Sequence, residues 1–398
     1  MTILATVSLM TPARLFGRVR HLPRWLSVRA AWRAGQRLAP LSPEPCDQSM
    51  LDEAETLRAA AIAGARDRHA GCGLRAFLVR PPTISGAIWF DTLGHALRHM
   101  GIPAVVLDAD ASDWSTQWRA LSPTLLVAPD REAIHARLDA GARDDLASRA
   151  GLRLLVHMAP AGFPFDAGGD AADEARLRRA VAGDTADAFL SLYEPEYFDR
   201  YAPTLAAAGF RYLALPQACD PFVDGPQPVP RTHAWFMAST FTPDRLAVAY
   251  DVLRPVLRNA PGLWVGSGWR FGAPRVQPAD LPALFSASRI ALAPLVPFLR
   301  DRPLEITYRV FAAAACGAFQ VTHRTPVTPR FFADDELVQA DDDATFAEAC
   351  AWYLPRPAER QAVARRALRR AWRDHTTFRR VDHLVAFVES LRATPRLS

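Results

Sequence analysis

The chain has 398 residues, of which 50% are hydrophobic and 22% charged, the balance of a globular protein able to bury more than one core. Its formal net charge is +5, but arginines and acids alternate and no zinc-finger, helix-turn-helix or RNA-recognition pattern occurs, so nucleic acid is not expected as a partner. Five cysteines without a C-x-x-C pair argue against a disulfide framework or a zinc site, and for a reducing compartment. The chain contains no lysine, so any phosphate bound by charge is bound by arginine.

Residues 1–70 are expected to form a basic helical extension. Seven arginines lie between Arg14 and Arg37, and no acid precedes Glu44. Trp25, Val28 and Trp32 would share one helical face. Two alternatives stay open: this extension packs on the body of the protein, or residues 12–40 lie on an anionic membrane surface. No apolar run approaches the ~20 residues of a membrane span and the start is a poor signal peptide, so the expected location is cytoplasmic, or peripheral at the inner face of the membrane.

Residues 71–222 alternate between strand and helix patterns, which predicts a parallel, doubly wound α/β sheet. A loop is expected over 81–86, after the first strand. The Asp108-Ala-Asp110 pair is more typical of a solvated loop than of a metal site. The expected strands are 74–79, 104–107, 124–127, 152–157, 186–192 and 212–215, with helices over 89–100, 131–140 and 194–208.

A proline-rich stretch over 221–230 predicts a linker to a second α/β domain, residues 231–391. Two such domains would place the carboxyl ends of their strands around a shared crevice. The Asp341–Asp343 run is expected to cap a helix. The expected strands are 234–238, 263–265, 290–293 and 319–322, with helices over 243–259, 279–288, 305–316, 343–354 and 358–391.

The segment Glu305-Ile-Thr-Tyr-Arg-Val-Phe-Ala-Ala-Ala-Ala-Cys-Gly-Ala-Phe resembles the R-x-F-E-x-x-A-C-G-x-F signature in the donor domain of GT-B glycosyltransferases, in particular their spore-maturation-protein-like branch. Ala238-Ser239-Thr240…Arg245, Gly266-Ser-Gly268-Trp269 and Leu215-Pro-Gln-Ala-Cys-Asp220-Pro are similar to further elements of the family. The resemblance covers residues 74 to 391. It implies two Rossmann-like domains and a hexosyltransferase-type enzyme that moves a sugar from a nucleotide-sugar to an acceptor, without a metal or other cofactor. The first domain would bind the acceptor and the second the donor.

Sugar transfer requires a stabilised diphosphate leaving group, and without a metal this falls to arginines and helix N-termini. His157, where family members end a strand in histidine, and Glu305 are the catalytic candidates, since a histidine pKa near ~6.5 suits proton transfer. Trp269 would pack on the nucleotide base or on its own domain. The donor-binding candidates are Gly86, Ser239, Thr240, Arg245, Gly266, Gly268, Trp269, Arg302, Tyr308 and Arg309.

The chain departs from the family at Ala312, where a glutamate usually holds the nucleotide ribose. Glu305 lies seven residues earlier and does not replace that contact. Related enzymes also use a lysine beside the diphosphate, and this chain contains no lysine. Two alternatives therefore stay open: a GT-B nucleotide-sugar epimerase or hydrolase, and a catalytically silent GT-B protein serving as a sugar-binding or assembly partner. The sequence names neither the donor nucleotide, the sugar, the acceptor nor the oligomeric state.

Overall fold

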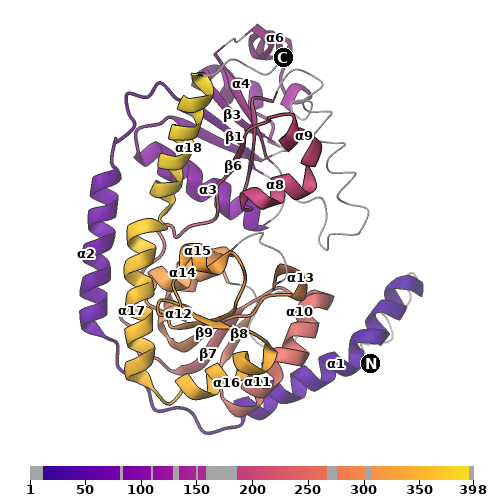
Figure 1. The fold of residues 1–398 in the computed structure, drawn as a ribbon, viewed down its shortest axis with the longest axis vertical. Helices are drawn as coiled ribbons and strands as arrows, with labels where there is room; N and C mark the ends of the chain where they lie inside the picture. The colour runs from indigo at the N-terminus through magenta and orange to yellow at the C-terminus, as the bar shows by residue number, and fades with distance from the viewer. Residues whose placement is uncertain are drawn as a thin grey trace. The chain divides into compact units, whose positions relative to one another are not determined.

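Two separate parallel sheets form the core of the protein (Figure 1). The chain divides into two compact units, which we call unit 1 (residues 1–55, 223–302 and 312–370) and unit 2 (residues 56–222, 303–311 and 371–398). The predicted pair of doubly wound α/β sheets is confirmed. The computed structural model describes residues 12–80, 84–108, 111–128, 134–148, 151–157, 186–266, 276–300 and 306–393.

Unit 2 contains a six-stranded parallel sheet in the order β2-β1-β3-β4-β5-β6. Its central strands are buried on both faces and read as continuous apolar runs, as expected when helices cover a parallel sheet. All six strands lie where the sequence predicts them. They are β1 (Ala76–Arg80), β2 (Ala104–Asp108), β3 (Leu125–Ala128), β4 (Arg153–His157), β5 (Ala188–Ser191) and β6 (Tyr212–Ala214).

The last helix of the chain, α18 (Thr377–Arg392), closes the core of unit 2 against α3 (Ile84–His99) (Figure 1). Its buried stripe joins one apolar cluster with β1, β3, β4 and β5. The stripe follows the helical period that the sequence shows and consists of Phe378, Val381, Leu384, Val385, Val388 and Leu391. The remaining helices of unit 2 are α4 (Trp114–Leu121), α6 (Ala140–Ser148), α8 (Pro195–Tyr201) and α9 (Pro203–Ala207).

Two helix predictions in unit 2 are wrong in their bounds. The single helix expected over 194–208 is interrupted at Ala202, because Pro203 lacks an amide and starts a new helix. In the region 131–140, Ile134 and His135 are helical as predicted, but the chain turns at 136–138 and the next helix, α6, begins only after Asp139. The Asp139 carboxylate accepts a hydrogen bond from the Ala142 amide at 3.0 Å, so this residue is an N-cap that starts a helix.

Unit 1 contains a five-stranded parallel sheet in the order β11-β10-β9-β7-β8. Four of the strands were predicted. The fifth, at the edge of the sheet, is only three residues long and carries a central glutamine, so its sequence gives no strand signal. The strands are β7 (His233–Ala238), β8 (Leu263–Val265), β9 (Ser288–Ala293), β10 (Gln320–His323) and β11 (Val338–Ala340).

The helix predicted over 243–259 in unit 1 is present, but with a change of winding. It runs as α10 (Pro243–Val248), a π-helical turn η2 (Ala249–Leu253) and α11 (Arg254–Asn259). The π turn lies just before Pro255, where a regular helix would place the proline ring against the carbonyl of Asp251. The other helical elements are η3 (Pro278–Asp280), α12 (Leu281–Ser286), α13 (Pro297–Arg300), α14 (Tyr308–Ala315), α15 (Thr328–Phe331), α16 (Asp343–Tyr353) and α17 (Pro357–Asp374).

The N-terminal extension forms α1 (Pro12–Gln36) and α2 (Gln48–Ala65), and α1 packs on α11 within unit 1 (Figure 1). Val28 is fully buried there, and the Gln36 amide nitrogen donates to the Gly262 carbonyl at 2.7 Å. This face is therefore covered by protein, as the packing alternative expects. None of the helices in the described ranges combines the length and apolar character that crossing a membrane requires.

Glu44, in the segment after α1, holds that segment within unit 1. Glu44 forms a two-way backbone bridge with Arg231, at 3.1 and 2.9 Å. The Glu44 carboxylate pairs with the side chains of Arg360, at 2.6 Å, and Arg289, at 2.9 Å. Arg360 is 3% exposed, so this pairing is shielded from solvent and compensates the burial of its charge.

Candidate functional site

The carboxyl ends of β7 and β8 meet at the first part of the candidate site. The Ser239 amide, which follows β7, donates to the Val265 carbonyl of β8 at 2.9 Å. Gly266, which follows β8, has a φ of +151°, and a Cβ added there would lie 1.8 Å from the Ser239 carbonyl oxygen. Only glycine permits the backbone segments that follow β7 and β8 to approach this closely. Two of the predicted donor residues, Ser239 and Gly266, are thus in contact.

The side chain of Arg245, which belongs to α10, lies at the same strand end. Thr242 caps that helix by accepting the Arg245 amide at 3.2 Å. The Arg245 guanidinium then donates from Nη1 to the Ser239 hydroxyl at 3.3 Å, while Thr240 beside it is exposed. Ser239, Thr240, Arg245 and Gly266 therefore form one group, which we call the strand-end cluster. A guanidinium fork beside hydroxyls is suited to bind a phosphate group.

His323 lies at the carboxyl end of β10 and is 1% exposed. Its Nδ1 atom accepts a hydrogen bond from the Leu295 amide at 3.1 Å, so a neutral ring carries its proton on Nε2. The Asp343 carboxylate lies 3.2 Å from Nε2. Burial, followed by the positive charge of Arg300, lowers the pKa of His323 to about 4, which keeps the ring neutral at physiological pH.

Arg300 is bound to the same group. Its guanidinium pairs with the Asp343 carboxylate, and its Nε donates to the Leu295 carbonyl at 3.2 Å. Leu295 is thus fixed at both its amide and its carbonyl. It belongs to the segment that leads from β9 to α14, so His323, Arg300 and Asp343 determine how that segment leaves the sheet.

The structure corrects the predicted start of the helix at 305–316. Residues Ile306 and Thr307 are not helical, and α14 begins at Tyr308. The Val310 amide, two residues later, donates to the Thr307 carbonyl at 3.0 Å. The two predicted donor residues Tyr308 and Arg309 are consequently the first two residues of the helix. The positive end of the helix dipole lies there.

Gln217 in unit 2 contacts the first residue of α14. Its side-chain oxygen accepts a hydrogen bond from the Tyr308 amide. The buried Arg380 donates to the carbonyls of Pro216, at 2.9 Å, and Gln217, at 3.2 Å, so the backbone that carries Gln217 is held as well. Burial lowers the pKa of the Arg380 guanidinium to about 10.

Ala312 is fully buried in α14. The position at which the sequence lacks the expected carboxylate is therefore enclosed by protein in this structure.

The first-domain candidates lie on β4 and α3. His157 is the last residue of β4, as predicted. Gly86 lies in the first turn of α3, so the expected loop over 81–86 is wrong from Ile84 onward. Gly268, Trp269, Arg302 and Glu305 lie outside the described residues, and their predicted roles stay predictions.

Sequence reasoning missed Gln217 and His323. Gln217 lies inside the matched Leu-Pro-x-Ala segment, and His323 directly follows the predicted strand 319–322, so their places were visible. Their partners, the Tyr308 and Leu295 amides, lie 91 and 28 residues away along the chain, and no local pattern points to them.

The acidic runs have structural roles. Asp342 caps α16 by accepting the Thr345 amide at 2.7 Å, which confirms the capping prediction. Asp108 pairs with Arg80 at 2.7 Å. Within the described ranges, no three His, Cys, Asp or Glu residues are grouped to hold a metal ion.

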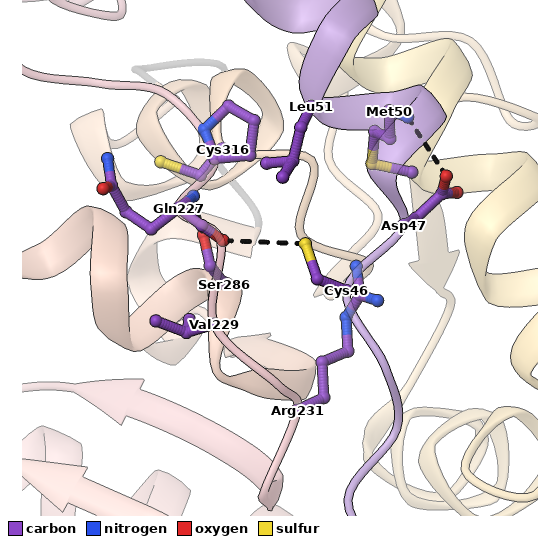
Figure 2. Close-up of a pocket in the computed structure, with 10 residues that line it drawn as sticks. Cys46, Asp47, Met50, Leu51, Gln227, Val229, Arg231, Ser286 and Cys316 are labelled. Carbon is purple, nitrogen blue, oxygen red and sulfur yellow. Dashed lines mark hydrogen bonds between the residues drawn. The ribbon is translucent and has the colours of Figure 1, made fainter.

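A pocket in unit 1 lies apart from the strand-end cluster. Figure 2 shows it between the segment that carries Cys46 and Met50 and the segment that carries Gln227 and Arg231. The Cys46 thiol contacts the Gln227 carbonyl at 3.9 Å, and burial raises the pKa of that thiol. None of the predicted site residues lines the pocket, so it marks where the N-terminal segment packs on unit 1.

One family model and several solved structures match parts of the chain. Residues 250–386, about a third of the chain, match the family model described as "Glycosyl transferase-like". Sucrose-phosphate synthase from Thermosynechococcus elongatus is similar in structure, with a TM-score of 0.57 and 12% identity over 80% of this chain and 99% of that one. Anabaena HepE in complex with UDP has a TM-score of 0.51 and 14% identity over 81% and 100%. No curated protein matches the chain in sequence.

A glycosyltransferase from Rickettsia africae covers 81% of this chain and all of its own length, with a TM-score of 0.52 and 8% identity. These structures align with the chain across both parallel sheets. The chain has the GT-B fold. In this GT-B chain, the matched glycosyltransferase-like domain includes Gly266, His323 and α14. Ser239 and Arg245 precede it by a few residues and complete the strand-end cluster.

Proposed function

We propose that the protein is a glycosyltransferase that moves a sugar from a nucleotide-sugar, first of all a UDP-sugar, onto an acceptor. The observation that carries the proposal is the strand-end cluster, where Arg245, Ser239 and Gly266 converge at the carboxyl ends of two parallel strands. Ligands of open α/β sheets bind at that edge. Anabaena HepE, a structural neighbour, has been solved with UDP and with UDP-glucose, which supports testing uridine nucleotides first.

The main chemical task of the donor site is to stabilise the leaving diphosphate. In our proposal Arg245 binds it together with Arg302. These groups stabilise the charge that develops as the bond between sugar and phosphate breaks. The proposal therefore includes metal independence, since arginines supply the positive charge. Gly266, Gly268 and Trp269 would border the nucleoside.

The acceptor side of the proposal rests on unit 2. His157 ends β4 at the carboxyl edge of its sheet, the edge where such sheets bind ligands. There it would accept the proton of an acceptor hydroxyl, with Gly86 allowing close approach and Glu305 near the transferred sugar. The spore-maturation-protein-like branch, a hexosyl donor and a location in the cytoplasm or at the inner membrane face belong to the same proposal.

Calorimetric titration with UDP tests the donor site. The Arg245→Gln variant should bind UDP roughly tenfold to hundredfold more weakly, since a hydrogen bond to a charged group contributes about 1.5–3 kcal/mol. Arg324→Gln is the matched control, because Arg324 lies in the same unit and pairs with Asp334 and Asp341 on the surface. Equal affinity of all three proteins for UDP would show that Arg245 does not bind the diphosphate.

A silent GT-B protein is the second candidate, and the buried Ala312 favours it. Such a protein would bind a nucleotide without turnover. UDP release from UDP-sugars, followed with and without an added glycan acceptor mixture, distinguishes the two. Binding without release from any sugar donor would favour the silent protein.

A further inference from the structure

The outward face of α1 is a surface that the proposed function does not use. Because Val28, Ala31 and Gly35 pack on unit 1, the opposite side of α1 is turned to solvent. A Cβ at Gly35 would lie 2.0 Å from the Leu257 carbonyl oxygen, so this packing is close and α1 is a fixed part of unit 1. The Arg254 guanidinium adds a contact to the Ser27 hydroxyl at 3.4 Å.

The exposed positions form one straight stripe. Successive residues of a helix turn by ~100°, so positions 22, 26, 30 and 33 fall within an arc of about 80°. Position 37 lies one residue beyond the end of α1. All five are exposed, and they are Leu22, Leu26, Ala30, Arg33 and Arg37. Leu22 is 48% exposed and Leu26 49%, and Leu38 just beyond the stripe is 44% exposed. Three of the five exposed large hydrophobic side chains among the described residues therefore lie within residues 22–38.

The charge of this region is mostly positive. The α1 sequence contains six arginines and no acid, and the neighbouring α11 adds the exposed Arg254 and Arg258. The two other elements that contact α1 contribute one acid each, Asp244 on α10 and Asp251 on η2. At a bilayer surface, leucines enter the interface and arginines reach the lipid phosphates. A stripe that combines exposed leucines with arginines is therefore suited to bind an anionic bilayer.

We propose that the outward stripe of α1 docks the protein on an anionic lipid surface. Trp25, Val28 and Trp32, the face expected from the sequence to be apolar, are not the contact face, since Val28 is fully buried in unit 1. The docking surface is the opposite one, with Leu22 and Leu26 in the interface and Arg33 and Arg37 on the lipid phosphates.

Flotation of the full chain with vesicles tests this proposal. We expect binding to phosphatidylglycerol-containing vesicles at 50 mM salt, weakened at 500 mM, and little binding to pure phosphatidylcholine. Arg33→Gln/Arg37→Gln should weaken binding roughly 30-fold, from about fivefold per arginine, and Leu22→Gln/Leu26→Gln roughly tenfold.

The matched control is Arg119→Gln/Arg373→Gln, which removes two arginines that are 55% and 61% exposed elsewhere. It should bind vesicles like the wild type. Because all the substituted side chains are exposed, each variant is checked for an unchanged melting temperature. Failure of the wild type to bind anionic vesicles, or an equal loss in the control, would overturn the proposal, and with it any lipid role of α1.

Discussion

The Nδ1 atom of His323 accepts a hydrogen bond from the Leu295 amide at 3.1 Å, and this bond joins the end of β10 to the segment that follows β9. Arg300 holds the carbonyl of the same leucine. The segment continues in sequence toward Arg302, one of the arginines of the proposed diphosphate site. A neutral, buried histidine thus anchors the backbone that leads to the proposed donor site.

This anchor predicts a loss of stability in mild acid. The pKa of His323 is about 4 in the folded protein, against ~6.5 for an unperturbed histidine, so the unfolded chain binds the proton more readily. The stabilisation is complete above pH 6.5 and is lost as the pH falls toward 4. Relative to His323→Asn, whose Oδ1 can accept from the Leu295 amide but does not titrate, the wild type should lose roughly 2 kcal/mol of unfolding free energy between pH 7 and pH 4.5.

Urea unfolding at the two pH values measures this difference. Both proteins retain Asp342 and Asp343, so the titration of those carboxylates largely cancels in the comparison. Parallel pH profiles of the two proteins would mean that His323 is already protonated or solvated in the folded state.

Gly266→Ala should disrupt the strand-end cluster. The new Cβ would lie 1.8 Å from the Ser239 carbonyl, and φ at +151° disfavours any side chain. We expect a loss of roughly 2–4 kcal/mol in the free energy of unfolding and no measurable UDP binding. Gly151→Ala is the control, because a Cβ there meets no atom within 4 Å, and it should be neutral or slightly stabilising. A Gly266→Ala protein as stable as the control would refute the close approach.

Gln217→Ala should weaken the start of α14. The Tyr308 amide would lose its acceptor, at a cost of about 1–2 kcal/mol in unfolding free energy. Gln117→Ala serves as the comparison, since the Gln117 side chain makes only an exposed hydrogen bond to Asp113, and its loss should cost less than about 0.5 kcal/mol. Indistinguishable unfolding curves for the two variants would show that the Tyr308 amide finds another partner.

Ala312→Glu tests the position where the sequence resemblance leads one to expect a carboxylate. Because Ala312 is fully buried, an uncompensated carboxylate there should cost several kcal/mol of stability and leave UDP affinity no higher. Ala344→Glu is the matched control, because Ala344 is exposed in the first turn of α16. This substitution should leave the free energy of unfolding nearly unchanged. A stable Ala312→Glu protein with tighter UDP binding would contradict the enclosed site and support an open ribose pocket.

Much of the fold was predictable because hydrophobic period determines where strands and helices form. The six strands of unit 2 and the stripe of α18 follow directly from it. The errors have local causes: Pro203 divides a helix, Asp139 starts one, and β11 has too few β-favouring residues to be recognised.

The site was predictable only where its residues lie in short motifs. Ser239, Arg245 and Gly266 were chosen from such motifs, and the structure brings them together. Gln217 and His323 act through backbone amides distant in sequence, so their roles depend on tertiary structure. The helical pattern of α1 showed an apolar face at Trp25 and Trp32 but not which side would be covered.

A thermal-shift panel measures whether unit 1 binds a nucleoside diphosphate through its arginines, as we propose. The protein is melted with UDP, GDP, dTDP, CDP or ADP, each with and without EDTA, because a ligand that binds only the folded state raises the midpoint. We predict that UDP raises the midpoint equally in both conditions and that Arg245→Gln shows a much smaller rise. No shift with any of the five nucleotides, or a shift abolished by EDTA, would contradict the account.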